Sequence, residues 1–307
     1  MSPFSRFSLY FTEVARSGSL RKAAERLHVS ASAINRQILQ AEDSFGIALF
    51  ERLPDGMRMT TAGELLYSDL LRWQHDFSLT RQRFDEIQGL RRGQVSIGLV
   101  QALTEGLLSE EITSIAREEA WLNLQLNVGS STELTQKVRE TELDFGLILD
   151  PETVSGVEVL AFAELEMGIV LPPHHRLNHR KNLSLSELRD ERHILPGNGL
   201  VVYERVRSLY ARTGQLPETA ISCNDIRLIR TLIADGAGVC VLSWLDVTED
   251  VRAGKLAFIP LRNRVLRPLT LGLCTVPSRQ LSRAALHVIK RLSAVIEIMH
   301  AGSLTAL

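Results

Sequence analysis

The sequence has 307 residues, of which 45% are hydrophobic and 23% are charged, and its formal net charge is −1. This length exceeds the needs of one small hydrophobic core and suits two or three domains. Because no apolar run is long enough to span a bilayer and the N-terminus lacks the apolar core of a signal peptide, we expect a cytoplasmic protein without a membrane partner.

Charge and cysteine content narrow the functional classes further. Residues 1–92 carry a net charge of +2 and the remainder a net charge of −3, which agrees with a DNA-binding N-terminal part but does not establish one. The cysteines are too widely spaced for a disulfide framework or a zinc ribbon. We therefore expect buried, reduced thiols at Cys223, Cys240 and Cys274.

Two short helices are predicted at the N-terminus. The first spans Phe4–Arg16, and Gly18 can end it by adopting a positive φ. Ser19 can cap a second helix over residues 20–27, since a serine hydroxyl accepts a hydrogen bond from the free N–H groups of a first helical turn.

A third helix is predicted from the cap at Ser30 to about Ala41. Ile34, Ile38 and Ala41 recur at helical spacing and form its apolar face. The opposite face carries short polar groups and one guanidinium, from Ser32, Asn35 and Arg36. A helix that packs on one side and is polar on the other can enter a DNA major groove.

A wing is predicted over residues 46–59, with two short strands at 49–50 and 57–59 joined by a hairpin turn at Asp55-Gly56. Arg52 and Arg58 flank it and can reach phosphates or a narrow minor groove. Arg58 could instead be a solvated surface charge. The candidate DNA-binding residues are thus Ser30, Ser32, Asn35, Arg36, Arg52 and Arg58.

Four motifs in this region resemble the N-terminal block of LysR-type transcriptional regulators. They are Phe11-Thr-Glu-Val-Ala-Arg-Ser-Gly-Ser19, Ala23-Ala-Glu-Arg-Leu-His-Val-Ser30, Leu49-Phe-Glu-Arg52 and Met59-Thr-Thr-Ala-Gly63. The resemblance is dense over roughly the first sixty residues and continues diffusely to the C-terminus. It implies a winged helix-turn-helix that binds promoter DNA.

The predicted recognition helix departs from the family pattern at two positions. Many members carry Gln where this chain has Ala31 and Ser where it has Asn35. Ala31 cannot make a bidentate contact with adenine, whereas Asn35 can. The target sequence of better-known members therefore does not transfer to this chain.

A long helix is predicted from the cap at Thr60 to about Gln88. Apolar residues recur along it at steps of four and three, with one polar step at Thr80, as in a coiled-coil seam. Two chains paired along this seam would place two recognition helices on one face of DNA. The alternative is that the stripe packs on the protein's own body. The predicted dimerisation residues are Leu66, Leu70, Trp73, Phe77, Phe84 and Ile87.

Beyond a linker at residues 89–93, the pattern changes to alternating strands and helices, which is typical of βαβ units with a parallel sheet. Strands are predicted at 95–100, 122–128, 145–149, 167–171, 221–223, 238–242 and 269–276. Helices are predicted at 104–119, 133–141, from caps at Ser184 and Asp225, and at 281–298.

The family resemblance implies that this C-terminal part resembles periplasmic binding proteins, whose chain crosses to a second lobe and returns. The crossings are expected near 161–166 and 264–268. The predicted fold class is α+β multidomain, with a winged helix-turn-helix (1–62), a linker and dimerisation helix (63–92) and a two-lobed α/β effector domain (93–307). Lobe I is expected to hold 93–163 and 267–307, and lobe II 164–266.

Ligands of open α/β sheets bind at the carboxyl ends of strands, where the free N–H groups of helix N-termini favour anions. The predicted effector-binding residues are Gln101, Ala102, Thr104, Ser130, Ser131, Asn198 and Asp225. An organic anion is the expected effector. However, many family members carry Ser or Thr in place of Ala102, so an uncharged or larger ligand is the alternative. Ser131 could also be a plain helix cap.

Other chemistries find less support. His175 and His179 would share a face only on a helix, which the prolines of residues 172–179 oppose, so no metal site is expected. No Gly-x-Ser-x-Gly elbow or P-loop is present, so we expect neither catalytic residues nor a cofactor. A redox switch on Cys223 and Cys240 lacks an electropositive setting.

The sequence thus predicts a LysR-type regulator whose promoter binding is modulated by a small molecule in the C-terminal cleft. A ligand that prefers one arrangement of the oligomer would change the spacing of the recognition helices. The expected partners are double-stranded promoter DNA, the effector and a second copy of the chain in a homodimer. A homotetramer and RNA polymerase are further candidates.

Overall fold

The computed structural model describes residues 5–54, 56–87, 93–151, 156–214, 220–262, 266–277 and 279–301. The chain divides into two compact units, one of residues 1–91 and 140–142 and one of residues 92–139 and 143–307, which we call the N-terminal and C-terminal units. Among the described residues, no helix combines the length and the apolar character that crossing a membrane requires.

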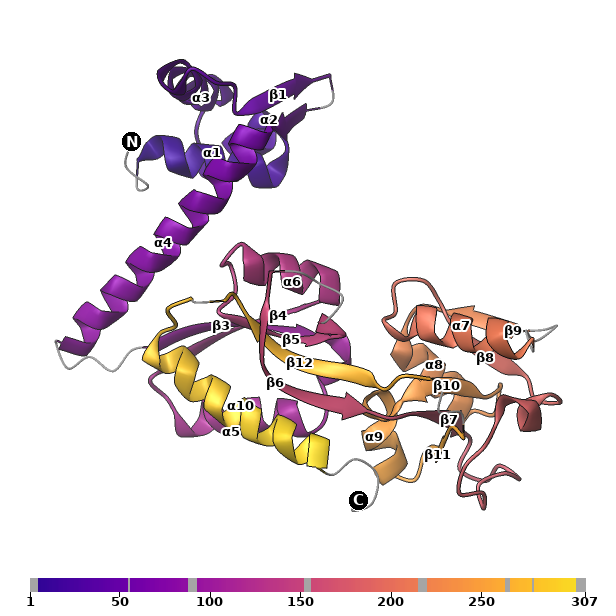
Figure 1. Ribbon diagram of the computed structural model, residues 1–307. Coiled ribbons are helices and arrows are strands. Elements are labelled where there is room, and N and C mark those ends of the chain that lie inside the picture. The colour runs from indigo at the N-terminus through magenta and orange to yellow at the C-terminus, as the bar shows by residue number, and fades with distance from the viewer. Residues whose placement is uncertain are drawn as a thin grey trace. The chain divides into compact units, whose positions relative to one another are not determined.

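Three helices open the N-terminal unit (Figure 1), and a serine side chain caps each of them. They are α1 (Arg6–Ser17), α2 (Leu20–Leu27) and α3 (Ala31–Phe45). The predicted bounds of α2 are confirmed. α1 begins later than predicted because the Ser5 side chain accepts a hydrogen bond from the Ser8 N–H, and Phe4 lies outside the described residues.

The end of α3 is a correction to the prediction. The helix does not stop at Ala41 but continues to Phe45, where Gly46 in the left-handed conformation (φ 69°) closes it. The additional turn carries Glu42, whose carboxylate accepts hydrogen bonds from the N–H groups of Leu49 and Phe50 at 2.8 and 3.1 Å. The extension thereby fastens the wing to the recognition helix.

The wing is an antiparallel hairpin of β1 (Phe50–Leu53) and β2 (Gly56–Met59). The turn predicted at Asp55-Gly56 is displaced, because Gly56 pairs with Leu53 and therefore belongs to β2. A Cβ atom on Gly56 would lie 2.4 Å from the carbonyl oxygen of Gly18. Glycine at this position is thus explained by a close approach between wing and helix bundle.

One hydrophobic core holds this unit together. Phe11, Val14, Ile34 and Ile38 are fully buried in it. The ring of Phe11 packs on that of Phe50 with centroids 5.1 Å apart. Burial of Ile34 and Ile38 fixes the rotation of α3 and turns its polar face outward, as the spacing predicted.

α4 (Thr61–Ile87) is the longest helix, and Figure 1 shows most of it standing clear of α1 to α3. Thr60 caps it as predicted, since its hydroxyl oxygen accepts a hydrogen bond from the Gly63 N–H at 3.1 Å. The helix is described to Ile87, and the predicted end at Gln88 lies outside the described residues.

The predicted seam of α4 divides into two parts. Leu70 is only 2% exposed and belongs to the core of the N-terminal unit, against which Leu66 also packs. For these two residues the alternative, packing on the protein's own body, is confirmed. The side chain of Ile87 lies outside the described part. Large apolar side chains are exposed further along the helix, at Trp73, Phe77 and Phe84.

Lobe I of the C-terminal unit is a five-stranded sheet in the order β4-β3-β5-β12-β6, with α5 and α10 on one face and α6 on the other (Figure 1). Its strands are β3 (Gly93–Val100), β4 (Leu122–Gly129), β5 (Phe145–Leu149), β6 (Glu158–Leu165) and β12 (Leu269–Thr275). Its helices are η1 (Gln101–Leu103), α5 (Leu107–Glu118), α6 (Ser131–Arg139) and α10 (Arg283–Ala301). In this sheet the β3–β4 and β3–β5 pairs are parallel as predicted, whereas β12 pairs antiparallel with both β5 and β6.

Lobe II contains a three-stranded antiparallel sheet in the order β10-β7-β11 and a parallel pair, β8-β9. Its strands are β7 (Met167–Leu171), β8 (His193–Pro196), β9 (Ala220–Cys223), β10 (Cys240–Ser243) and β11 (Ala257–Pro260). Its helices are η3 (Leu185–Leu188), α7 (Val202–Thr213), α8 (Ile226–Ala234) and α9 (Trp244–Arg252). Of these elements, β8, β11, α7 and α9 were not predicted.

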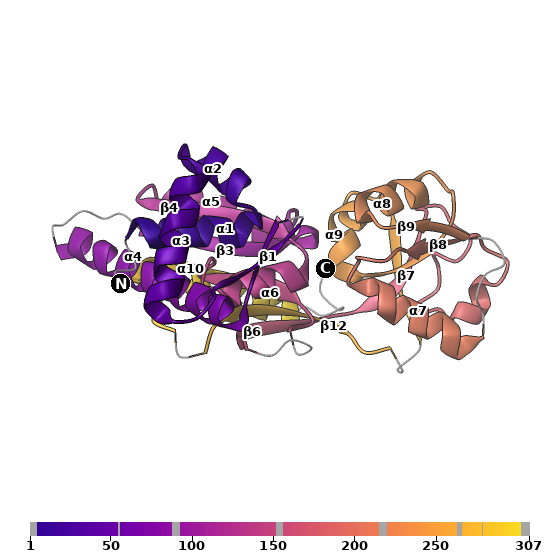
Figure 2. The ribbon, with the colours of Figure 1, turned by 90° about the horizontal axis from the view of Figure 1, so that it is seen from above.

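Two segments connect the lobes, and Figure 2 shows β6 and β12 side by side where they lead toward lobe II. The first crossing is shorter than predicted, because Leu165 still pairs with Leu269 in the first sheet and Glu166 alone separates β6 from β7. One strand leaves the lobe and the other returns, so the two pair antiparallel. The second crossing follows Pro260, and residues 263–265 lie outside the described part.

Candidate nucleic-acid interface and ligand cavity

The outward face of α3 carries the predicted DNA-binding residues. Ser32 and Arg36 are exposed, and Asn35 is half-buried. The Ser30 hydroxyl is engaged locally: its oxygen accepts a hydrogen bond from the Ala33 N–H at 3.2 Å and lies 3.1 Å from the Ser32 hydroxyl. Arg36 makes no hydrogen bond or ion pair with any described residue, so its guanidinium is available to a phosphate.

One contact joins the recognition helix to the wing. The Arg52 Nη1 atom donates a hydrogen bond to the Asn35 Oδ1 atom at 2.9 Å. This fixes the orientation of the Asn35 amide and directs its two N–H donors away from Arg52. The structure thus brings together two of the predicted residues that are distant in sequence.

Arg58 is placed differently from Arg36. Its guanidinium pairs with the Glu51 carboxylate across the wing, with an Nε to Oε2 distance of 2.9 Å. The pair is exposed, and exposed pairs contribute little to stability. Contact between Arg58 and a phosphate would replace this pair.

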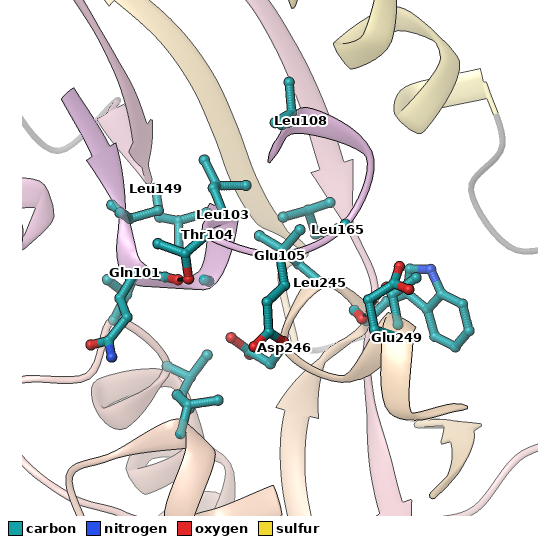
Figure 3. Close-up of a pocket in the computed structure, with 18 of the residues that line it drawn as sticks. Gln101, Leu103, Thr104, Glu105, Leu108, Leu149, Leu165, Leu245, Asp246 and Glu249 are labelled. Atoms are coloured by element: carbon teal, nitrogen blue, oxygen red, sulfur yellow. Dashed lines mark hydrogen bonds between the residues drawn. The ribbon is translucent and has the colours of Figure 1, made fainter. Parts of the chain in front are cut away.

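The two lobes enclose a cavity of about 800 Å³ (Figure 3). Five predicted effector-binding residues line it: Gln101, Ala102, Thr104, Ser130 and Ser131. Asn198 and Asp225 do not line it, but their neighbours Gly199 and Asn224 do. Five of the seven predicted residues thus line the cavity, and the other two lie one position away from a lining residue.

The segment after β3 is not the predicted helix start. Residues 101–103 form a single 3₁₀ turn, and the Thr104 hydroxyl donates a hydrogen bond to the Gln101 carbonyl oxygen at 2.8 Å. α5 begins only at Leu107, after Gly106 with φ 82°. Thr104 therefore does not begin α5, whose first residues, Leu107 and Leu108, also line the cavity.

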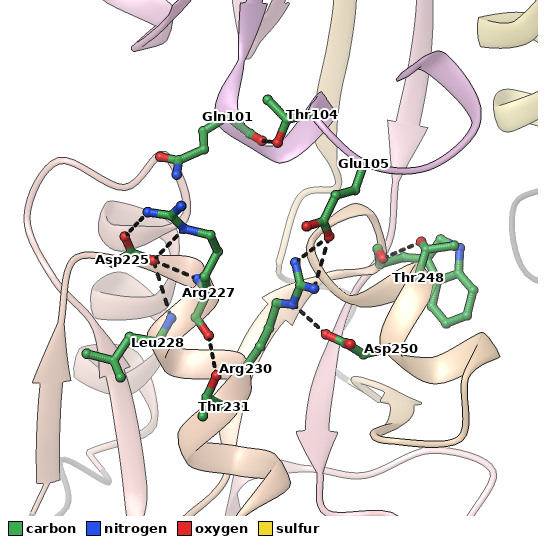
Figure 4. Close-up of polar contacts among 11 residues, drawn as sticks. Gln101, Thr104, Glu105, Asp225, Arg227, Leu228, Arg230, Thr231, Thr248 and Asp250 are labelled. Carbon is green, nitrogen blue, oxygen red and sulfur yellow. Dashed lines mark hydrogen bonds and ion pairs between the residues drawn. The ribbon is translucent and has the colours of Figure 1, made fainter. Parts of the chain in front are cut away.

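Three arginines in the lining were not predicted: Arg227, Arg230 and Arg252. Arg230 on α8 of lobe II lies between two carboxylates (Figure 4), Asp250 of its own lobe and Glu105 of lobe I, with Nη1 3.0 Å from the Glu105 Oε2 atom. The prediction that Asp225 caps a helix is confirmed, and Arg227 and Arg230 lie in the first turns of that helix. Nothing local in the sequence indicated that Glu105 would meet Arg230.

A second ion pair also joins the lobes. The Nη2 atom of Arg205, on α7, lies 2.7 Å from the Oδ1 atom of Asp150. Asp150 is the residue that directly follows β5. Asp150 has a positive φ of 53°, and its carboxylate also accepts a hydrogen bond from the Thr270 N–H on β12. Asp150 thereby binds both the sheet of lobe I and a helix of lobe II.

The cysteine and histidine candidates carry no site in the described structure. Cys240 and Cys274 are buried. Burial raises the pKa of the Cys240 thiol well above its usual value and raises the pKa of the Cys274 thiol to about 12, which is opposite to what a reactive thiolate needs. Cys223 is half-buried rather than fully buried as predicted. His175 lies 3.3 Å from the Glu191 carboxylate. Within the described ranges, no group of three or more His, Cys, Asp or Glu side chains is arranged to hold a metal.

Comparison with known families identifies the chain. The model of the LysR substrate binding domain matches residues 88–296, and that of the bacterial regulatory helix-turn-helix protein, lysR family, matches residues 8–64. The chain belongs to the LysR family. The winged helix-turn-helix and the two-lobed domain of this LysR-type regulator confirm the predicted fold class. As a member of the family it is a transcriptional regulator with a DNA-binding and an effector-binding domain.

Individual relatives of this LysR-type regulator are distant. CysL of Bacillus subtilis is 24% identical over 257 residues, covering 84% of this chain and 86% of the relative. The dual regulator GltC of the same organism is 28% identical over 234 residues, 76% of this chain and 78% of its own. Full-length OxyR from Pseudomonas aeruginosa has a similar fold, with a TM-score of 0.70 and 20% identity over 97% of this chain and 95% of its own.

Proposed function

We propose that this LysR-type regulator binds promoter DNA by inserting the outward face of α3 into the major groove, while the wing contacts the sugar-phosphate backbone of the DNA. In this arrangement Asn35 contacts a base edge, while Arg36 and Arg52 contact phosphates. Ser30 and Ser32 lie at the N-terminus of α3 and supply further backbone contacts. Arg58 contributes to the backbone contacts of the wing after releasing Glu51.

The hydrogen bond between Arg52 and Asn35 carries this proposal. An asparagine recognises adenine through two simultaneous hydrogen bonds, so the orientation of its amide decides whether it can discriminate. Arg52 holds that orientation before DNA arrives and, being on the wing, also couples the base contact to the backbone contact. The two elements then bind as one preorganised surface.

The proposed regulator acts as a dimer through the exposed part of α4. Trp73, Phe77 and Phe84 recur along this helix and expose large apolar side chains, and a second copy of the helix would bury them. Because Leu66 and Leu70 already belong to the core of the N-terminal unit, the proposed seam starts at Trp73. The proposed domain boundaries remain those of the sequence, with residues 63–92 as linker helix and 93–307 as effector domain.

Ligand binding in the cavity is proposed to shift the relative positions of the two lobes, which ion pairs such as Arg205–Asp150 span. A ligand with different affinity for two arrangements of the lobes shifts their populations, and an oligomer can transmit the shift to its recognition helices. Pairing of dimers into a tetramer and contact with RNA polymerase complete the proposed assembly.

Binding of the purified full chain to fragmented DNA of its host, followed by sequencing of the bound fragments, tests the proposed DNA interface. We expect a few promoter sites, each with two related half-sites about one helical turn or a multiple of it apart. The variant with Asn35→Ala and Arg36→Ala should lose these sites, whereas Arg189→Ala, an exposed change in lobe II, should retain them. Uniform recovery of all fragments by the wild-type chain would contradict the proposal.

A further inference from the structure

Three of the helix N-termini around the cavity, those of α6, α8 and α9, are already occupied by carboxylates of the chain, whereas α5 and α7 begin there without a side-chain cap. At α8, the Asp225 carboxylate accepts hydrogen bonds from the N–H groups of Arg227 and Leu228 at 2.8 and 3.3 Å. At α9, the carboxylate of buried Asp246 accepts the Ser243 N–H at 3.1 Å. These N–H groups attract anions, and here the anion is the protein's own.

The same holds at α6. The Glu133 carboxylate folds back over this N-terminus, and a Cβ atom on Gly129 would lie 2.9 Å from one of its oxygens. Lys137 has the largest effect in lowering the pKa of Glu133, and a hydrogen bond from the Ser130 backbone N–H lowers it further. The Ser131 hydroxyl oxygen accepts the Leu149 N–H at 3.2 Å. The two serines expected to receive an anionic effector are thus placed beside a carboxylate.

The cationic side chains of the lining are likewise engaged. Arg230 holds Glu105 at 3.0 Å and Asp250, and Arg227 holds Asp225 at 2.8 Å (Figure 4). Arg252 holds Glu249 at 3.0 Å. Of the described lining residues, no arginine or lysine is left without a carboxylate partner.

One carboxylate of the lining, that of Glu166, has an oxygen atom without a hydrogen-bond partner among the described residues. Glu166, the residue that crosses between the lobes, has an Oε2 atom that is buried and lacks a hydrogen-bond partner among the described residues. Burial raises the pKa of Glu166, as expected for a carboxyl group removed from water without a counter-ion. A buried acceptor in this state gains from a ligand that brings a donor.

The rest of the lining is largely apolar. Aliphatic side chains from both lobes contribute, including Leu103, Leu149, Leu165, Leu200, Ile226 and Leu245, several of which Figure 3 labels. Such a lining accommodates an apolar body, and the few polar groups decide its head group.

We propose that the effector is an organic amine: a mainly apolar molecule with one basic nitrogen, whose proton is shared with the Glu166 carboxylate. This rests on the proposed function of the cavity as the effector site and replaces the organic anion that the sequence predicted. An anion would meet an excess of carboxylates and would have to displace one from its arginine. An amine meets an unpaired acceptor at the residue that connects the lobes.

Matched series of small molecules test the proposal. Each series keeps one apolar body and changes only the head group: benzylamine, benzyl alcohol and benzoate, with naphthyl and hexyl counterparts. Thermal unfolding and calorimetric titration of the full chain should show binding by amines, weaker binding by alcohols and none by acids. Glu166→Gln should weaken amine binding about tenfold because it removes the charge-assisted hydrogen bond. Glu158→Gln, the same change at an exposed position of β6 outside the lining, should not.

The inference is overturned if acids bind as tightly as amines, if no amine binds, or if the Glu166→Gln and Glu158→Gln proteins bind the amine equally. Fluorescence anisotropy with a recovered promoter fragment separates this from failure of the proposed function. An acid that binds in the cavity and alters DNA affinity would refute the amine and leave effector control intact. Loss of specific DNA binding by the wild-type chain would refute the proposed function itself.

Discussion

Arginine is used in opposite ways in the two units of this protein. On α3, Arg36 is exposed and contacts no described partner, so its charge is available to a ligand. In the cavity, Arg230 lies between Asp250 and Glu105, with 20% of its side chain exposed. Both residues lie on short amphipathic helices, so what differs is whether the folded chain brings a carboxylate to them.

The difference decides whether an arginine can bind a ligand or instead stabilises the fold. An unpaired guanidinium at a surface contributes affinity for a polyanion at little cost to folding. A guanidinium held by two carboxylates is part of the structure, because its removal leaves them without a counter-charge. Each prediction below changes one side of this contrast.

The largest effect is expected from Arg230→Met in the cavity. It leaves the mostly buried Asp250 carboxylate uncompensated, so the free energy of unfolding should fall by about 3 kcal/mol in urea titrations. Arg36→Met, the matched change on α3, should alter it by less than about 0.5 kcal/mol. The Arg230→Met, Asp250→Asn double variant should recover part of the loss. Equal stability of the Arg230→Met and Arg36→Met proteins would remove the contrast.

Asn35→Ala should change the sequence preference of DNA binding more than its affinity. Removing the bidentate contact should reduce discrimination at one base pair by about 1–3 kcal/mol, with non-specific affinity nearly unchanged. Arg52→Ala should cause the same relaxation and also weaken binding to all DNA, because Arg52 both orients Asn35 and contacts phosphate. Competition assays with single base-pair variants of a recovered site measure both. Equal losses on every sequence with Asn35→Ala would contradict a base contact.

The N-terminal unit was the more predictable of the two because its signals are local. The caps at Ser19 and Ser30 and the stop at Gly18 each involve residues within one helical turn, and all three are present. The end of α3 was missed because Gly46, the local stop signal that closes it, was assigned to the wing. The hydrogen bonds that Glu42 accepts from Leu49 and Phe50 come from tertiary structure and have no local signal.

In the C-terminal unit the sequence indicated the strand and helix pattern but not the pairing. β6 was overlooked because it is an edge strand with exposed apolar residues such as Phe162, so its pattern lacks the alternation of a half-buried strand. The cavity loops were found through their position after strands, whereas the Arg230–Glu105 pair spans 125 residues and has no local signal. Glu166 likewise has no local signal, because it lines the cavity only once the two lobes are folded on either side of it.

Arg36→Ala should have a smaller effect, confined to electrostatics. Losing one phosphate contact should weaken binding to all DNA about tenfold and reduce the slope of log affinity against log salt concentration by about 1. Anisotropy titrations over a range of salt concentrations provide the slope. Arg21→Ala on α2, whose guanidinium already pairs with Glu25, serves as the control and should leave the slope nearly unchanged. An unchanged slope in the Arg36→Ala protein would place Arg36 outside the phosphate contacts.

The smallest effect concerns Asp225, whose pair with Arg227 is exposed and therefore weak. The Arg227 side chain, with the N–H groups of α8, lowers the pKa of Asp225 to about 2. Because the folded-state pKa lies below the unfolded value of about 3.9, this carboxylate contributes stability above that value and loses the contribution as the pH falls toward about 2.

Asp225→Asn isolates this contribution, since asparagine caps a helix as well as aspartate but does not titrate. The free energy of unfolding of both proteins is measured in urea between about pH 5 and pH 2. In the difference between the two values, the contributions of the carboxylates that both proteins share cancel. The stability advantage of the wild-type chain should be present at the upper end and disappear at the lower end. A constant difference across the range would mean that Asp225 stabilises the protein by capping α8 and not through its charge. An anionic ligand would then be able to displace the Asp225 carboxylate.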